Sequence, residues 1–196
     1  MLTAIVDYSS GNLHSARKAF EKISVSNNLG SVVVTSNPDV ISSADRLVLP
    51  GDGAFPSCKT ELLSSEAYDA MVYAAVEKGR PFLGICVGMQ LMAIKGYEYE
   101  ETDGLGWVDG EVSKINPKDK NLKIPHMGWN TVVPKLPHPL YKDLNDQFSC
   151  YFLHSYVYET QSTTNILSIT QYGTTFTSSI QKNNIMATQF HPEKSH

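Results

Sequence analysis

One cysteine between two glycines constrains the possible folds of this chain most, because it lies where a predicted strand meets a predicted helix. Residues 82–85 form an apolar run that predicts a buried strand, and residues 87–94 read as the start of a helix, with Cys86 at the junction. Gly84 and Gly88 lie two positions to either side, so neighbouring backbone can approach the turn without a Cβ clash. Such a turn strains the residue at its tip and points its side chain outward. The segment therefore predicts a nucleophile elbow in a sheet protein.

The predicted position of Cys86 also affects its chemistry. The unpaired N–H groups and the dipole at a helix N-terminus favour a thiolate, the nucleophilic form of cysteine. The alternative interpretation is that Cys86 is a small buried hydrophobic residue. A nucleophilic role therefore requires a partner that can accept a proton.

Length and composition favour one domain, residues 1–196, with one sizeable core. The residues are 41% hydrophobic and 18% charged, with no apolar run long enough to span a membrane. The net charge of −4 and the scattered basic residues argue against nucleic-acid binding. The first six residues lack the basic start of a signal peptide, so we expect a cytoplasmic protein. Three widely spaced cysteines without a CxxC argue against disulfides and zinc.

Apolar periodicity divides the chain into two halves. The first half alternates short, nearly continuous apolar runs with helical patterns, which is typical of a parallel sheet buried on both faces. Its predicted strands are residues 2–6, 32–35, 46–49 and 82–85, and its predicted helices begin near Leu13, Pro38 and Tyr68. The second half predicts antiparallel strands at residues 111–115, 130–133, 147–158, 166–171, 175–181 and 185–190. We expect an α/β fold whose central, mostly parallel mixed sheet is flanked by helices, with antiparallel hairpins in the second half.

The segment His191-Pro192-Glu193 offers a base for the cysteine. Proline biases the preceding residue toward an extended conformation, in which residues i and i+2 point to the same side. Glu193 can then hold one ring nitrogen of His191 while the other nitrogen faces a thiol, as in a Cys-His-acid triad. The alternative is a histidine-proline turn followed by a solvated glutamate.

The loop Gly51-Asp52-Gly53 follows a predicted strand and suits stabilisation of an oxyanion. Flanking glycines allow the N–H of Asp52 to turn toward negative charge on a carbonyl oxygen, and the N–H of Val87 is the natural second donor. A phosphate-binding loop is the alternative, but the sequence has no Walker lysine and no GxGxxG here. A metal site from His126, His154 and His191 is a further alternative, but their spacing matches no ligand motif, so we expect neither metal nor cofactor.

Together these segments resemble a known enzyme family. The cysteine elbow with a C-terminal His191-Pro192-Glu193 resembles the class I, triad-type glutamine amidotransferases. Further segments resemble, within that class, the glutaminase subunits of imidazole glycerol phosphate synthases. They are Asp7-Tyr8 with Gly11-Asn12-Leu13, the Pro50–Phe55 loop, His126-Met127-Gly128-Trp129-Asn130, His154-Ser155-Tyr156 and Gln189-Phe190-His191-Pro192-Glu193-Lys194-Ser195.

The resemblance implies that glutamine is hydrolysed to glutamate and ammonia. By the family pattern Cys86 forms a glutamyl thioester, His191 shuttles the proton and Glu193 orients the imidazole ring of His191. The residues implied to bind glutamine are Gly53, Gln90, Glu98, Ser155 and Tyr156. Asn12 and Lys194 are implied to contact the partner, a cyclase subunit with a (β/α)8 barrel. That partner would receive the ammonia through a channel and make imidazole glycerol phosphate and aminoimidazole carboxamide ribotide in histidine biosynthesis.

Two departures from the family pattern and two alternatives accompany this resemblance. Position 52 is aspartate where many members of the family carry valine, and the C-terminal helix of the family is expected to be absent after His196. A paralogous subunit that feeds ammonia to a sugar-modifying synthase is one alternative. A non-catalytic regulatory domain of the same fold is the other, although Cys86, His191 and Glu193 are all present.

Overall fold

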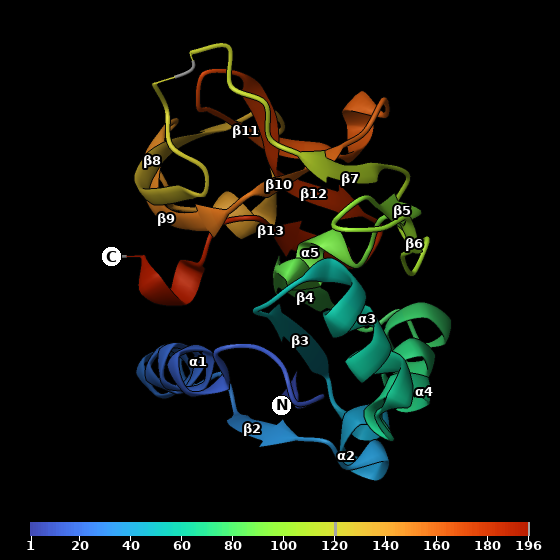
Figure 1. Cartoon of the computed structure of the whole chain (residues 1–196). Coiled ribbons are helices and arrows are strands. Elements are labelled where there is room, and N and C mark those ends of the chain that lie inside the picture. The colour runs from blue at the N-terminus through green and yellow to red at the C-terminus, as the bar shows by residue number, and fades with distance from the viewer. Residues whose placement is uncertain (120, 196) are drawn as a thin grey trace.

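A computed structural model describes residues 1–119 and 121–195 (Figure 1). The first half alternates strands and helices as predicted, because apolar runs and helical patterns follow one another along the chain. Asn37 caps the second helix by accepting hydrogen bonds from the N–H groups of Asp39 and Val40. The elements are β1 (Leu2–Val6), α1 (Leu13–Asn27), β2 (Ser31–Thr35), α2 (Pro38–Ser43), β3 (Arg46–Gly51), α3 (Phe55–Ser64), α4 (Ala67–Val72), a π-helical turn (Tyr73–Glu77), β4 (Phe82–Cys86) and α5 (Val87–Gln90).

The second half consists of strands with short 3-10 turns. Turns at Gly173 and at Asn183-Asn184 join the last three strands. The elements are β5 (Lys95–Gly96), β6 (Thr102–Asp103), β7 (Glu111–Lys114), β8 (His126–Pro134), a 3-10 turn (Pro139–Tyr141), β9 (Phe148–His154), β10 (Tyr156–Glu159), a 3-10 turn (Thr163–Asn165), β11 (Ile166–Gln171), β12 (Thr175–Lys182), β13 (Ile185–Thr188) and a 3-10 turn (Pro192–Lys194).

The strands form a mixed sheet, which confirms the predicted fold class. Its order is β2-β1-β3-β4-β13-β12-β10-β7-β5-β6; β11 also pairs with β12 and with β8, and β8 pairs in turn with β9. The five strands from β2 to β13 are mutually parallel, whereas β12 runs antiparallel to β13. The C-terminal strand β13 therefore lies directly beside β4, the strand that ends in Cys86.

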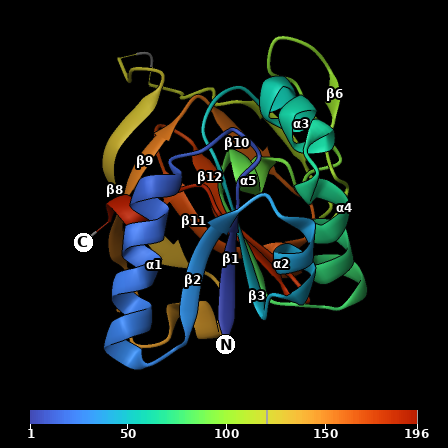
Figure 2. The same cartoon turned by 90° about the horizontal axis from the view of Figure 1, so that it is seen from below.

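Helices cover both faces of the parallel part of the sheet. Figure 2 shows α1 on one side of the strands and α2, α3 and α4 on the other. Most buried apolar side chains form one cluster between these layers, with Phe82, Leu49 and Ile5 fully buried in it. A smaller cluster that includes Phe152 lies under the strands of the second half. No helix in residues 1–119 and 121–195 is long and apolar enough to cross a membrane.

Several strand ends differ from the prediction: the strand expected over residues 130–133 begins at His126, and the one expected over residues 185–190 ends at Thr188. Three larger features are also wrong. The helix expected over residues 87–94 ends at Gln90, because the carbonyls of Leu91 and Met92 accept hydrogen bonds from the loop N–H groups of Leu105 and Val108 instead of continuing the helix. The strand expected over residues 147–158 is two strands, β9 and β10. The break falls at Ser155, where the chain leaves its pairing with β8 and joins β7.

The third correction concerns the glycine-rich loop after β3, which was expected to extend through Phe55. Helix α3 begins at Phe55 instead. The buried positions Phe55, Cys58 and Leu62 recur at helical spacing, with a proline in the first turn. The helix therefore packs this apolar stripe into the core.

Candidate active site

Cys86 occupies the tip of a sharp turn between β4 and α5. Its φ of 56° and ψ of −112° are strained for a residue with a side chain. Both glycines are needed for the close packing of this turn: a Cβ on Gly88 would lie 1.9 Å from the carbonyl oxygen of Leu49, and a Cβ on Gly84 would lie 2.6 Å from that of Gly88. Helix α5 is a single turn of four residues, so its start offers free N–H groups rather than a long-helix dipole.

The parallel pairing of β13 with β4 brings the C-terminal segment to this turn. Thr188 lies opposite Ile85, so the chain that follows β13 runs past Cys86. There Nδ1 of His191 lies 2.8 Å from Oε1 of Glu193, and the backbone N–H of His191 donates to the carbonyl of Tyr151. The two side chains are only 5% and 3% exposed. The structure thus brings the three residues of the predicted triad together.

The surroundings of His191 favour its protonated form. Burial alone lowers its pKa, but the hydrogen bonds to Cys86 and Glu193 and the negative charge of both groups outweigh burial and raise the pKa to about 9. At neutral pH the imidazole therefore carries both protons.

The loop after β3 borders the same site, and hydrogen bonds to its carbonyl oxygen fix the peptide between Asp52 and Gly53. The carbonyl oxygen of Asp52 accepts hydrogen bonds from Oγ of Ser10 at 2.8 Å and from Sγ of Cys58 at 3.7 Å. In a trans peptide the N–H points opposite to the C=O, so the N–H of Gly53 points away from Ser10. Gly53 has a φ of 131°, which suits glycine.

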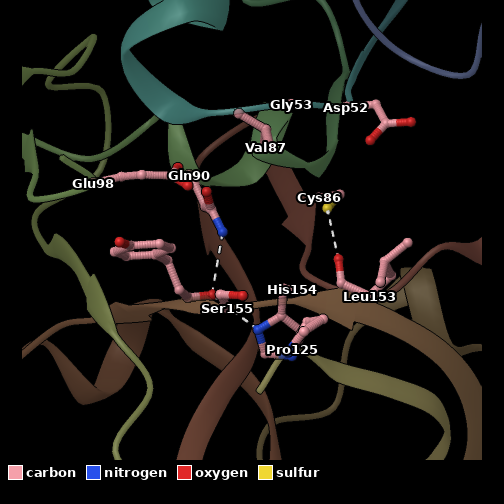
Figure 3. Close-up of a pocket in the computed structure, with 11 residues that line it drawn as sticks. Asp52, Gly53, Cys86, Val87, Gln90, Glu98, Pro125, Leu153, His154 and Ser155 are labelled. Carbon is pink, nitrogen blue, oxygen red and sulfur yellow. Dashed lines mark hydrogen bonds between the residues drawn. The ribbon is translucent and has the colours of Figure 1, made fainter. Parts of the chain in front are cut away.

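The direction of the Asp52 side chain matters because many members of the family carry valine at this position. In the view of Figure 3 its carboxylate lies on the far side of Cys86 from Gln90 and Glu98. The predicted donor was the N–H of Asp52. The fixed carbonyl identifies the next N–H, that of Gly53, as a further donor beside the pocket.

A small pocket opens in front of Cys86 (Figure 3). Its volume is about 210 Å³, which is below the range of drug-sized ligand sites and suits a ligand as small as an amino acid. The pocket brings together most of the residues predicted for the site. It is lined by Asp52, Gly53, Cys86, Val87, Gln90, Glu98, Pro125, Leu153, His154, Ser155 and Tyr156.

Two of the residues predicted to bind a ligand are also held by the protein itself. Nε2 of Gln90 donates to the carbonyl of Tyr156 at 3.2 Å and to Oε1 of Gln189 at 3.0 Å. Oε2 of Glu98 accepts a hydrogen bond from the N–H of Phe55 at 2.8 Å. Glu98 therefore caps the start of α3 while its carboxylate lines the pocket.

A pair of buried histidines supports the wall of the pocket. Nδ1 of His126 and Nε2 of His154 lie 2.9 Å apart, and Nδ1 of His154 donates to the carbonyl of Tyr156 at 2.9 Å. Burial lowers the pKa of His126 to about 4 and that of His154 to about 3, so both rings are neutral. Within residues 1–119 and 121–195, no group of three or more His, Cys, Asp or Glu side chains is placed to hold a metal ion.

The two residues predicted at a subunit interface lie outside the pocket. Asn12 caps α1 by accepting a hydrogen bond from the N–H of Ser15. Nζ of Lys194 lies 5.9 Å from the centre of the Tyr151 ring. Their contact with another subunit stays a prediction.

Sequence reasoning missed Gln189, whose amide reaches the sulfur of Cys86. Nε2 of Gln189 lies 3.6 Å from Sγ, and the side chain is completely buried. A signal was present, because residues two apart in an extended segment point to the same side and Gln189 lies two positions before His191. Pro125 and Leu153 were missed as well, since a pocket wall built from distant loops has no local pattern.

Comparisons with known proteins agree with this geometry. The family model described as glutamine amidotransferase class-I matches residues 4–196. The chain is 54% identical over 196 residues to a protein of Ruegeria pomeroyi named imidazole glycerol phosphate synthase subunit HisH, and the match covers 100% of this chain and 92% of that protein. A protein of the same name from Rhodopseudomonas palustris is 48% identical, with 100% and 93% covered.

Solved structures show the same fold at low sequence identity. A crystal structure of a glutamine amidotransferase superposes with a TM-score of 0.71 at 17% identity, covering 97% of this chain and 90% of that chain. A glutamine amidotransferase from Thermotoga maritima gives a TM-score of 0.68 at 15% identity, covering 98% and 76%. The chain belongs to the class I glutamine amidotransferases and, within them, to the family of imidazole glycerol phosphate synthase subunit HisH.

Proposed function

We propose that this chain hydrolyses glutamine to glutamate and ammonia, as the glutaminase subunit of an imidazole glycerol phosphate synthase in histidine biosynthesis. One observation carries the proposal: a strained cysteine lies beside a buried His191–Glu193 pair at the edge of a small pocket. That combination suits acyl transfer through a thioester.

In the first step the thiolate of Cys86 attacks the carboxamide carbon of glutamine, and a C–S bond forms. The carbonyl oxygen becomes an oxyanion, stabilised by the N–H of Val87 and by N–H groups of the loop at Asp52 and Gly53. One such donor lowers a barrier by about 2.7–4 kcal/mol.

Collapse of this intermediate breaks the C–N bond. The imidazolium of His191 protonates the leaving amine, so ammonia departs and a glutamyl thioester remains. Water then attacks the thioester carbon, His191 takes its proton, and cleavage of the C–S bond releases glutamate. Glu193 keeps the ring oriented and balances its charge in both steps.

The substrate's amino-acid head fits the opposite end of the pocket. Glu98 supplies a carboxylate for the ammonium group, and Gln90 has its carbonyl oxygen left as an acceptor because Nε2 is already engaged. Backbone groups of Gly53, Ser155 and Tyr156 complete the site.

The relatives' name describes one subunit of a synthase, which supports the proposal that a second subunit consumes the ammonia. We propose that it is a cyclase with a (β/α)8 barrel, docked at the mouth of the pocket beside Asn12 and Lys194. Direct transfer makes chemical sense, because free ammonia in neutral water is mostly non-nucleophilic ammonium.

We propose that residues 1–196 act as one domain and that the reaction takes place in the cytoplasm.

Glutamate release tests the proposal. The chain alone, the chain with the cyclase, and the chain with cyclase and its ribonucleotide ligand are compared at equal concentration. We expect slow release from the chain alone and strong stimulation in the third mixture, because glycines on both sides of Asp52 allow its N–H to be turned away until the cyclase has bound its ligand. Equal rates in all three would contradict the coupling, and no release in any would contradict the function.

A further inference from the structure

A chain of hydrogen bonds that ends on the reactive sulfur begins at one backbone carbonyl. The carbonyl of Tyr156 can only accept hydrogen bonds, so the amide group of Gln90 that faces it must present Nε2. The same Nε2 lies 3.0 Å from the side-chain amide of Gln189. Because Nε2 of Gln90 is a donor, Gln189 must face it with Oε1.

The orientation of Gln189 is thereby fixed. With Oε1 turned toward Gln90, Nε2 faces Sγ of Cys86 at 3.6 Å. Gln189 is completely buried and Gln90 is 3% exposed, so water does not compete for these groups. The backbone N–H of Gln189 donates to the carbonyl of Ser178, which fixes the main chain as well.

We propose that Gln189 is a further catalytic residue, which donates an N–H hydrogen bond to the Cys86 thiolate, and that Gln90 positions its amide for this contact. A hydrogen bond to a charged acceptor in a buried site is stronger than one to a neutral acceptor. The donor therefore favours the thiolate over the thiol. Gln189 lies behind the sulfur and does not line the pocket, so it acts on reactivity rather than on substrate binding.

Other titratable groups also surround the sulfur and affect the pH dependence of its reactivity. They are His191 and Glu193 from the C-terminal turn, Asp52 from the loop after β3, Cys58 from α3, Glu98 from the opposite wall of the pocket, and His154 and Tyr156 from β9 and β10. None of them is changed by substitution of Gln189, so a matched pair of variants isolates the amide.

The test is the rate of alkylation of Cys86 by iodoacetamide as a function of pH, followed by peptide mass spectrometry of the whole chain. Gln189→Met keeps the volume of the side chain and removes the donor. We expect the midpoint of the rate profile to move upward by about 1 to 2 pH units. Gln90→Leu leaves the Gln189 amide free to rotate and is expected to give a smaller shift in the same direction.

Gln181→Leu is the matched control, because Gln181 donates to the carbonyl of Thr164 on the surface and does not line the pocket. Its profile should match that of the unmodified chain. A folded Gln189→Met protein with an unchanged midpoint would overturn the proposal, and Gln189→Leu serves as the second variant if the first fails to fold.

Turnover with the cyclase present gives a second measurement. We expect kcat of Gln189→Met to fall by about 10- to 100-fold at neutral pH, with KM for glutamine little changed. The inference rests on the proposed role of Cys86, but the alkylation profile does not depend on glutamine. An unshifted profile in an active glutaminase would reject only the role of Gln189, whereas absent glutaminase activity would reject the proposed function.

Discussion

Oε1 of Glu193 accepts a 2.8 Å hydrogen bond from Nδ1 of His191, two positions earlier in the chain. The second carboxylate oxygen, Oε2, is buried and has no hydrogen-bond partner among residues 1–119 and 121–195. The whole charge of this carboxylate is therefore directed at one imidazole. That arrangement gives a first prediction.

We expect Glu193→Gln to keep the ring of His191 in place and to lower its pKa, because the amide carries no negative charge. With less imidazolium available to protonate the leaving amine, kcat should fall by about 10²- to 10⁴-fold. Steady-state kinetics with the cyclase and an NMR titration of His191 measure the two effects. Glu101→Gln, at an exposed residue paired with Lys95, is the control and should change neither.

The same raised pKa of His191 affects stability at alkaline pH. Its contribution is complete below 6.5, the ordinary pKa, and is lost as pH rises through about 9. Urea unfolding between pH 6.5 and 9 should therefore show a decline that is smaller in Glu193→Gln. An equal decline in both proteins would contradict this assignment.

The buried histidine pair gives the opposite dependence at acid pH. His126 and His154 stay neutral in the folded protein because burial lowers their pKa values to about 4 and about 3 from 6.5, whereas the unfolded chain binds protons below 6.5. Between pH 6.5 and 5 the pair should lower the free energy of unfolding by roughly 2 to 4 kcal/mol. His126→Gln should reduce this slope in urea titrations, and His14→Gln, at an exposed residue, should not.

Cys86→Ala should abolish glutamine hydrolysis, because no other group in the site can form the thioester. Synthesis by the complex from added ammonium salts should persist, since that reaction belongs to the cyclase. Glutamate release and product formation are measured in parallel. Cys150→Ala, which removes a buried thiol outside the pocket, should retain hydrolysis; residual hydrolysis by Cys86→Ala would mean that the nucleophile is another residue.

Ser10 is predicted to set the orientation of the loop peptide. Ser10→Ala removes the 2.8 Å hydrogen bond to the carbonyl of Asp52, so the peptide that presents the Gly53 N–H gains freedom to rotate. We expect kcat to fall by about 3- to 10-fold with little change in KM, and Ser10→Thr to restore it. Ser9→Ala, at the exposed neighbouring residue, is the control. Equal kcat in Ser10→Ala and the unmodified chain would exclude this role.

The parts of the fold that sequence predicted correctly are those with a local cause. The strand at residues 166–171 has the same bounds in the structure, because its apolar residues lie between clear turn signals. Cys86 has the expected strained backbone conformation, because the flanking glycines and the strand–helix junction define that turn locally.

Features that depend on distant segments were missed. The early end of α5 is caused by hydrogen bonds from a loop later in the sequence, at Leu105 and Val108. The break at Ser155 reflects competition between β8 and β7 for the same chain. The contact of Gln189 with Cys86 joins residues 103 positions apart. The spacing to His191 indicated the side on which Gln189 lies, but no local pattern predicts that the amide of Gln90 fixes its orientation.

The insertion of β13 between β4 and β12 has a consequence for biosynthesis. Cys86 precedes the whole antiparallel half of the chain, and its imidazole and amide neighbours arrive only with β13 and the turn that follows. During synthesis, Cys86 is therefore added to the chain long before its base, His191. Until β13 has paired with β4, Cys86 has neither His191 nor Gln189 beside it, so the order of the strands delays assembly of the site until β13 joins the sheet.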